Sequence, residues 1–137
     1  MAAIPLDGEH DLLPEVDSAI EDGRIRAIGT VPPDFVPEQT IDGREFLALP
    51  AFFTGAPADL ILLDTRGVHW APRHDLAANV VYASHPADVR YVFCDGRPLL
   101  WDGELVTLDE ERIRYEAERR AFRMVGTPMR QVRRYRG

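Results

Sequence analysis

The 137-residue sequence contains a single cysteine, Cys94, and no lysine. One cysteine excludes an intramolecular disulfide and any metal site built from a cluster of cysteines. No apolar run approaches the ~20 residues that a membrane-spanning helix needs. The amino-terminal residues also lack the basic and apolar regions of a secretory signal. We therefore expect a cytoplasmic protein that does not attach to a membrane.

The positive charges are unevenly distributed along the chain. All 16 basic residues are arginines, and the net charge is −7. Residues 1–111 hold 7 arginines and 21 acidic residues, whereas residues 112–137 hold 9 arginines and 2 acidic residues. An acidic body therefore precedes a basic tail, and we expect the tail to fold against that body. Nucleic-acid binding would need a larger basic face with interleaved aromatic residues, so we expect no nucleic-acid partner.

Asp-Gly pairs occur five times, and four of them, at 22–23, 42–43, 95–96 and 102–103, are expected to form turns after short strand-like runs. Residues 16–21 and 24–29 alternate around Asp22-Gly23, which is the strongest short-range hairpin signal because both turn positions favour positive φ. Four consecutive apolar residues within 58–64 predict a fully buried strand. The alternation in 88–94 places Val89, Tyr91 and Phe93 on one face. Further strands are expected at residues 2–6, 46–49, 97–101 and 104–106.

Two helices are expected. Residues 76–83 show helical spacing of apolar side chains, and residues 109–124 repeat it over a longer stretch. Thr107 or Asp109 can cap the second helix, acidic residues occupy its start, and arginines occupy its end, as the helix dipole favours. The sequence therefore predicts one mainly β domain over residues 1–137. We expect a small β-sandwich or partly open barrel of about eight short strands with these two helices.

Four stretches resemble one known family when they are taken in order. They read AIEDGRIRAIG (19–29), IDGREFLALPAFF (41–53), GAPADLILLD (55–64) and, over residues 74–113, a segment that begins HDLAANVVYASHPADV. Together they resemble the amidohydrolase superfamily, specifically its deaminase and chlorohydrolase branch, and are closest to the adenosine-derivative deaminases. Ala51 replaces the glycine of the Leu-Pro-Gly-Phe segment that is typical of this family.

The resemblance implies that a large part of the family's enzymes is missing inside this chain. In the family a catalytic TIM barrel, typically ~250 residues, separates the two halves of a small composite β-sandwich domain. Here Phe53 is followed directly by Thr54. The resemblance therefore implies a composite domain made of residues 1–53 and 54–124, with a basic tail at 125–137 and no barrel.

The metal ligands of the family cannot be placed in this sequence. The family's His-x-His pair does not occur, and the four histidines fall on expected loops. The nearest grouping is His69, His74 and Asp75, for which a solvated or capping role is expected rather than metal binding. The sequence thus predicts no catalytic residue, no cofactor-binding residue, no metal ligand, no cofactor and no enzyme activity. The remaining histidines are His10 and His85.

Other functional readings remain open at this stage. Cys94 is expected to be a small core residue rather than a nucleophile. The chain could act as an interaction or self-association module, through a face that the missing barrel leaves exposed and that would include Phe52, Phe53 and Trp70. It could also be an enzyme of another kind, or a hydrolase only by homology. Ser84-His85 carries no obvious acidic partner for catalysis.

Overall fold

The computed structural model describes residues 2–3, 16–49 and 54–126. Its contacts divide the chain into two compact units, residues 1–104 (unit 1) and residues 105–137 (unit 2). The described strands are β1 (Ala2–Ala3), β2 (Asp17–Glu21), β3 (Arg24–Gly29), β4 (Phe46–Leu49), β5 (Leu60–Asp64), β6 (Val89–Cys94), β7 (Arg97–Trp101) and β8 (Glu104–Leu105), and the helices are α1 (Leu76–Tyr82) and α2 (Glu110–Met124). Two 3-10 turns, η1 (Val68–Trp70) and η2 (Pro86–Asp88), flank α1.

The prediction of a mainly β fold with about eight short strands and two helices is confirmed. The observed helices begin and end within a residue of the expected bounds. The single domain with its three segments stays a prediction, whereas the observed units divide after Glu104. In the part of the chain that the structure describes, neither helix has the length and apolarity that a membrane span requires.

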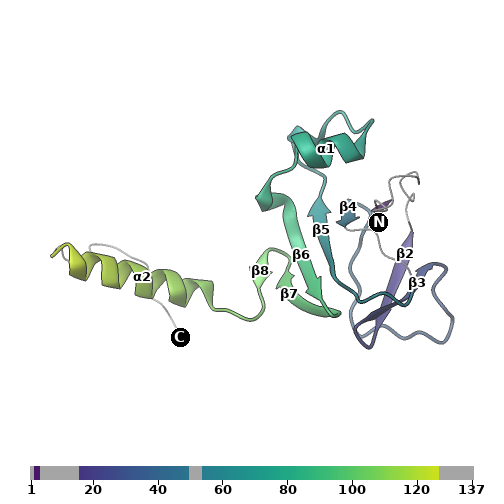
Figure 1. The fold of residues 1–137 in the computed structure, drawn as a ribbon, viewed down its shortest axis with the longest axis horizontal. Helices are drawn as coiled ribbons and strands as arrows, with labels where there is room; N and C mark the ends of the chain where they lie inside the picture. Colours follow the sequence, from purple (N-terminus) through teal and green to yellow (C-terminus); the bar gives the residue numbers. More distant parts are fainter. Residues whose placement is uncertain (1, 4–15, 50–53, 127–137) are drawn as a thin grey trace. The chain divides into compact units, whose positions relative to one another are not determined.

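Strands from both sequence halves form one sheet. The six strands follow the order β1-β4-β5-β6-β7-β8, while β2 and β3 form a separate antiparallel hairpin (Figure 1). β1 is parallel to β4, and β4 is antiparallel to β5 with Leu47 opposite Leu63. The strands described here close no barrel. We call the Phe53-Thr54 position, where the family's barrel would be inserted, the joint. Pairing of β4 with β5 therefore connects residues before the joint to residues after it.

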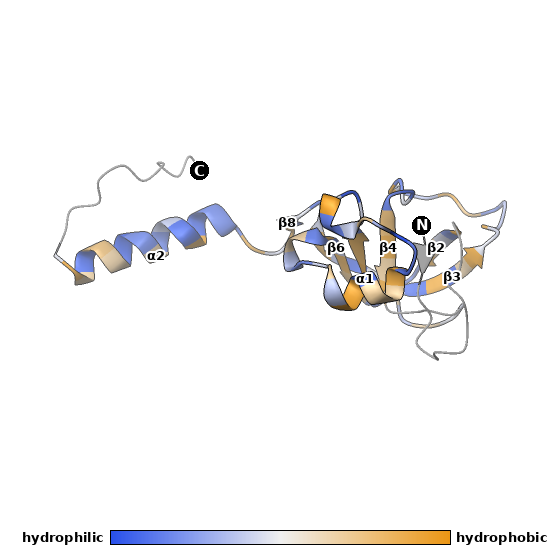
Figure 2. Ribbon diagram, turned by 90° about the horizontal axis from the view of Figure 1, so that it is seen from above, coloured by the Kyte–Doolittle hydropathy of each residue, from blue (hydrophilic) through white to orange (hydrophobic). Residues whose placement is uncertain are grey.

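Strand β5 has both of its faces covered, as its apolar run predicted. Leu60 and Leu62 pack with Ala48 on one face, where Ile20 of the hairpin contributes. Leu63 packs on the other face with residues of β4, η1 and α1. Figure 2 shows the matching hydropathy, with orange along the sheet and on α1. The core of unit 1 therefore consists of two apolar layers, one on each side of this strand.

The prediction that Val89 shares a face with Tyr91 and Phe93 is wrong, because β6 contains a β-bulge. Leu62 lies opposite Tyr91, but Leu63 lies opposite Val89, so Arg90 has no partner of its own in this ladder. One extra residue moves the following side chains to the other face of a strand. Val89 consequently packs in the Leu63 layer, whereas Tyr91 packs in the Leu62 layer.

Of the four Asp-Gly pairs that lie within the described residues, three form hairpin turns with positive φ at both residues: Asp22-Gly23, Asp95-Gly96 and Asp102-Gly103. This matches the primed turns that suit the twist of antiparallel strands. The fourth pair, Asp42-Gly43, is not among the positive-φ positions. There Gly43 O accepts a hydrogen bond from Phe46 N at 3.0 Å, and a simple turn leads into β4.

The turns 22–23 and 95–96 contact each other directly. A Cβ atom on Gly96 would lie 2.7 Å from Gly23 Cα. Residues after the joint connect to both turns, because Ala58 N donates to Gly23 O at 2.9 Å and Ala58 O accepts from Gly96 N at 3.0 Å. Ile25 N also donates to Ala56 O at 2.9 Å. The segment that follows the joint therefore hydrogen-bonds to hairpins from both halves of the sequence.

Candidate functional site

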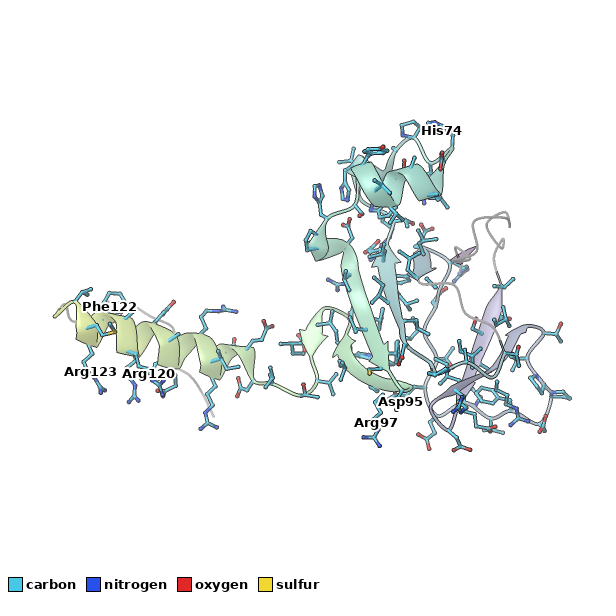
Figure 3. The ribbon with its side chains drawn as sticks, in the orientation of Figure 1. His74, Asp95, Arg97, Arg120, Phe122 and Arg123 are labelled. Carbon is cyan, nitrogen blue, oxygen red and sulfur yellow. The ribbon has the colours of Figure 1, made fainter. Side chains whose placement is uncertain are left out.

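The structure does not bring the expected group of His69, His74 and Asp75 together as a site. Asp75 is the N-cap of α1, since its Oδ1 accepts from Ala78 N at 2.9 Å. This is the capping role that the sequence allowed for it. His74 lies in the exposed loop before that helix (Figure 3). Within the described residues, no group of three or more His, Cys, Asp or Glu side chains could hold a metal ion. His10 lies outside the described residues.

His69 instead belongs to a polar cluster centred on Asp88. His69 Nε2 lies 2.9 Å from Asp88 Oδ2, and Trp70 Nε1 donates to the same oxygen at 3.1 Å. The backbone N–H of His85 also donates to Asp88 Oδ2, at 2.8 Å. The rings of His69 and His85 are 4.6 Å apart. We call His69, Trp70, His85 and Asp88 the Asp88 cluster.

Local sequence explains how the Asp88 cluster forms. Gly67 precedes η1, and a Cβ atom at that position would lie 2.3 Å from the His69 ring. The absence of a side chain there lets the ring lie over the backbone. Asp88 is the third residue after His85, the spacing at which an acidic side chain can reach back to the N–H of an N-cap residue. That spacing was the sequence signal for Asp88, which the sequence reasoning missed.

Hydrogen bonding determines the ionisation of Asp88. The carboxyl group is buried, which by itself favours the neutral form. The bonds from the His85 backbone, His69 and Trp70 outweigh this effect and lower the pKa of Asp88 below its usual value. Asp88 is therefore an ionised acceptor held by three donors. Such an arrangement fixes the positions of η1 and η2 relative to one another.

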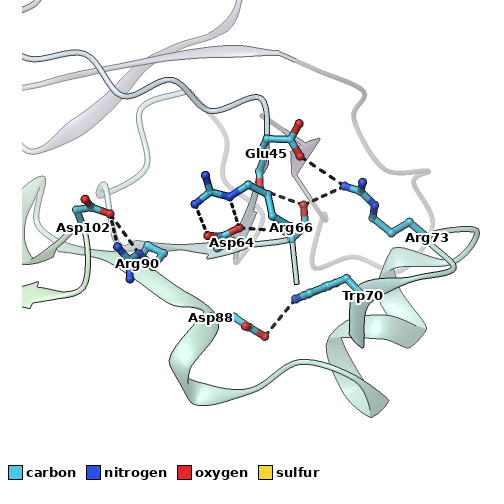
Figure 4. A network of polar contacts seen from close by, with 9 residues as sticks. Glu45, Asp64, Arg66, Trp70, Arg73, Asp88, Arg90 and Asp102 are labelled. Atoms are coloured by element: carbon cyan, nitrogen blue, oxygen red, sulfur yellow. Dashed lines mark hydrogen bonds and ion pairs between the residues drawn. The ribbon is translucent and has the colours of Figure 1, made fainter. Parts of the chain in front are cut away.

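Ion pairs lie where β5 ends and β6 begins (Figure 4). Arg66 contacts Asp64 at 2.5 Å, and Arg90 contacts Asp102 at 2.6 Å. Arg66 lowers the pKa of Asp64 through these hydrogen bonds. Arg44 likewise lowers the pKa of Asp42 to about 2, chiefly through a side-chain hydrogen bond.

An open depression of about 350 Å³ lies beside these pairs, lined by Asp42, Arg44, Glu45, Phe46 and Arg66. Its two arginines are each paired with a carboxylate. A charged ligand would have to compete with those existing partners. The depression therefore has neither an uncompensated charge nor a candidate nucleophile among its lining residues.

Aromatic rings from β4, β6 and β7 pack against one another. Tyr91 lies edge-to-face against Phe46 at 5.4 Å and against Trp101 at 5.3 Å. Phe93 approaches Trp101 at 6.3 Å. Burial raises the pKa of Tyr91. Edge-to-face contacts of this kind stabilise a core. The role of Trp101 is therefore explained by its packing against Tyr91 and Phe93.

Two expectations for single side chains are wrong. Trp70 was a candidate for an exposed interaction face, but it is completely buried between β4, β5 and α1. Cys94 was expected in the core but is exposed, because it is the last residue of β6 and adjoins the turn at Asp95-Gly96. Phe52 and Phe53, the other candidates for that face, lie outside the described residues.

Comparisons with known proteins identify the relatives of this chain. No protein-family model matches the sequence. Curated relatives do match, and they are 5-methylthioadenosine/S-adenosylhomocysteine deaminases. The protein from Desulforamulus reducens is 38% identical over 112 residues, which cover 74% of this chain and 26% of the relative. The protein from Dictyoglomus thermophilum is 51% identical over 71 residues, covering 52% and 17%. That from Natronomonas pharaonis is 34% identical over 120 residues, covering 84% and 28%.

A solved structure is also similar: an adenosine deaminase from Xanthomonas campestris with bound zinc, at 25% identity and a TM-score of 0.49. It is matched over 55% of this chain and 17% of its own length.

The sequence matches confirm the resemblance. The chain is related to a part of the deaminases of the amidohydrolase superfamily. Within that superfamily the relatives are those that act on adenosine derivatives, according to their names. The matches cover about a sixth to a little over a quarter of these relatives, from 17% to 28%. Such short coverage agrees with a chain that lacks the catalytic barrel.

Proposed function

We propose that this chain is a non-catalytic accessory β domain of the amidohydrolase type, which folds without a barrel and without the metal ligands that a barrel would carry. One observation supports this proposal most strongly. Strands β4 and β5 come from opposite sides of the joint and pair directly, with four residues of each in register. A short connection lowers the entropic cost of bringing two strands together. The two halves therefore have no need of an intervening domain in order to pair.

The arrangement of polar groups in unit 1 also supports a structural role. The buried carboxylate of Asp88 is held by three donors, and Arg66 and Arg90 are each paired with a carboxylate. A hydrolytic deaminase of this superfamily needs a metal-activated water, which requires convergent ligands. We accordingly propose no catalytic residue, no cofactor-binding residue and no metal ligand in this chain.

Metal content and deaminase activity test the proposal together. The purified chain is assayed with 5-methylthioadenosine, S-adenosylhomocysteine and adenosine, with and without added zinc, and its metal content is measured by elemental analysis. We expect less than stoichiometric metal and no turnover above a protein-free blank. Turnover that a chelator abolishes and zinc restores would contradict the proposal. If such turnover is found, His74→Ala will test whether His74 is a metal ligand.

A protein-interaction role is the second candidate. Helix α1 packs on the core through Leu76 and Val80 but leaves Val81 73% and Tyr82 88% exposed. Large exposed apolar side chains on one short helix favour contact with a partner. If this surface binds a protein, Val81→Ser with Tyr82→Ser will abolish the association without lowering the stability of the fold. If association is absent, or survives both substitutions, this candidate is rejected.

We further propose a cytoplasmic location and no nucleic-acid partner. The acidic charge of residues 1–111 would repel phosphate groups. Fractionation of cells that express the tagged chain tests the location, and a mobility-shift assay at physiological salt tests nucleic-acid binding. Retardation of a nucleic acid at physiological salt would contradict the second point.

A further inference from the structure

Helix α2 carries an apolar stripe, although none of its residues is buried. Ile113, Ala117, Ala121 and Met124 recur at spacings of four, four and three residues, so they lie along one face. We call these four residues the α2 stripe. Ile113 is 52% exposed and Met124 is 86% exposed, and no residue of α2 is buried. The rest of the helix is mostly hydrophilic (Figure 2).

A helix of this kind is marginal by itself. Its 15 residues are near the lower limit at which an isolated helix is stable in water. The Asp109 cap and the charged ends contribute only modestly. In proteins, most helical stability comes from packing of an apolar face. The α2 stripe would therefore be stabilised by a partner.

The charges of α2 indicate which partner would fit. Glu110 and Glu111 occupy its first turn, while Arg119, Arg120 and Arg123 are gathered near its end. Arg120 and Arg123 extend from the side of the helix opposite Phe122 (Figure 3) and have no acidic partner among the described residues. A second α2 running in the opposite direction would place its acidic start beside this basic end. A parallel copy would place like charges together.

The border of the stripe is complementary in the same way. Glu116 and Arg120 are four residues apart and lie along one border of the α2 stripe. Consider an antiparallel pair whose two-fold axis passes between Ala117 and Ala121. The border that carries Glu116 and Arg120 on one helix then lies beside the same border of the other helix, with the two chains running in opposite directions. Glu116, which pairs with Arg119 of its own helix at 2.7 Å, then also meets Arg120 of the other copy, and the two alanines at the centre let the backbones approach closely.

We propose that α2 is a self-association element, whose occupant is the α2 stripe of a second copy of this chain in antiparallel orientation. Two helices of this length bury less than the roughly 1,200 Å² of a standard stable interface. The dimer is accordingly weak, and its population rises through the micromolar range. This surface is distinct from Val81 and Tyr82 on α1.

The oligomeric state of the full chain tests the proposal. Sedimentation velocity is measured over a dilution series that reaches high micromolar concentrations. We expect a monomer–dimer equilibrium in the unmodified chain. Ala117→Glu with Ala121→Glu places carboxylates in the stripe and raises the dissociation constant by about a hundredfold or more. Arg112→Glu is the control, because it changes the net charge by the same amount on another face and leaves the dimer intact.

A second experiment swaps the charges at positions 116 and 120, and it tests the proposal even if the double stripe variant loses its helix. Glu116→Arg alone and Arg120→Glu alone each create two like-charge contacts in the antiparallel dimer, which weakens each homodimer by about tenfold. An equimolar mixture of the two variants restores opposite charges at both contacts. Native mass spectrometry is expected to show the heterodimer as the main dimer in that mixture.

Several results would overturn the proposal. They are a monomer at every concentration, a dimer that persists in the double stripe variant, and a mixture in which heterodimer does not exceed the statistical share. A dimer lost instead through Val81→Ser and Tyr82→Ser would assign association to α1 and also overturn it.

Discussion

Unit 1 and helix α2 differ in how far apart in the sequence their stabilising contacts reach. In unit 1, main-chain bonds link residues such as Ala58 to Gly23 and to Gly96, which are more than thirty residues away. In α2 the cap and the ion pair join residues only three positions apart, Asp109 with Arg112 and Glu116 with Arg119. A fold based on distant contacts loses stability cooperatively, whereas a helix based on local ones frays gradually.

Burial differs as sharply as contact range. Trp70, Ile25 and Leu47 are fully buried in unit 1. Helix α2 has no buried residue and exposes Ile113 and Met124. The same mutation type should therefore have a large effect in unit 1 and a small, confined effect in α2.

The largest effect is expected from removing Trp70. Trp70→Ala deletes a completely buried side chain and the donor to Asp88. A cavity of this size costs about 3–5 kcal/mol, which is a large share of the stability of a small domain. We expect a substantially lower midpoint in urea unfolding, followed by near-UV circular dichroism. Val68→Ala, at a neighbouring side chain that is 89% exposed, is the control and should leave the midpoint unchanged.

The contact between the two hairpin turns should give the second-largest effect. Gly96→Ala forces a Cβ atom to 2.7 Å from Gly23 Cα at a φ of +70°. We expect a loss of about 2 kcal/mol or more, from backbone strain and displacement of the neighbouring turn. Gly29→Ala is the matched control, because its φ is +90° but nothing lies within 4 Å of the added atom. Equal losses in the two variants would mean that the contact between the turns contributes nothing.

The Asp88 cluster adds a pH-dependent term to unit 1. Asp88→Asn weakens charge-assisted bonds to three donors, and we expect a loss of about 2 kcal/mol near neutral pH. Because the pKa of Asp88 is lowered in the fold, its stabilisation is complete above the unfolded value of ~4 and is lost as the pH falls through the folded value. The difference between wild type and variant should therefore shrink below pH ~4.

Urea unfolding at a series of pH values checks this expectation. Asp95→Asn is a suitable control, since Asp95 is exposed and asparagine tolerates its positive φ. A difference that stays constant down to pH ~3 would contradict the assignment of Asp88 as an ionised acceptor.

Local signals in the sequence predicted much of this fold. The strands at 24–29 and 46–49, the three Asp-Gly hairpins and the Asp109 cap depend on residues that are close in sequence. Each is determined by backbone preference or by a bond across a few positions, which a single sequence displays directly.

The expectations that failed concern long-range packing. Val89 faces the layer opposite Tyr91 because of a bulge in the pairing of β6 with β5. Trp70 is buried because α1 folds over it, and Cys94 is exposed because β6 extends past the core. Asp88 was missed as a centre because one of its donors, His69, is nineteen residues away. Of these arrangements, only the spacing of Asp88 from His85 has a signature in neighbouring residues.

The smallest effect is expected in α2, and it bears most directly on the difference between the regions. Asp109→Ala removes the acceptor for Arg112 N, which lies 2.8 Å from Asp109 Oδ1. The loss of such a cap costs about 1 kcal/mol. For a marginal helix, this should appear as a lower helical signal at 222 nm in far-UV circular dichroism, while the urea midpoint of unit 1 stays unchanged. Asp109→Asn keeps an acceptor at the cap and should retain most of the signal. A lower midpoint of unit 1 in the alanine variant would show that the stability of the sheet depends on the helix, and the contrast between distant and local stabilisation would then fail.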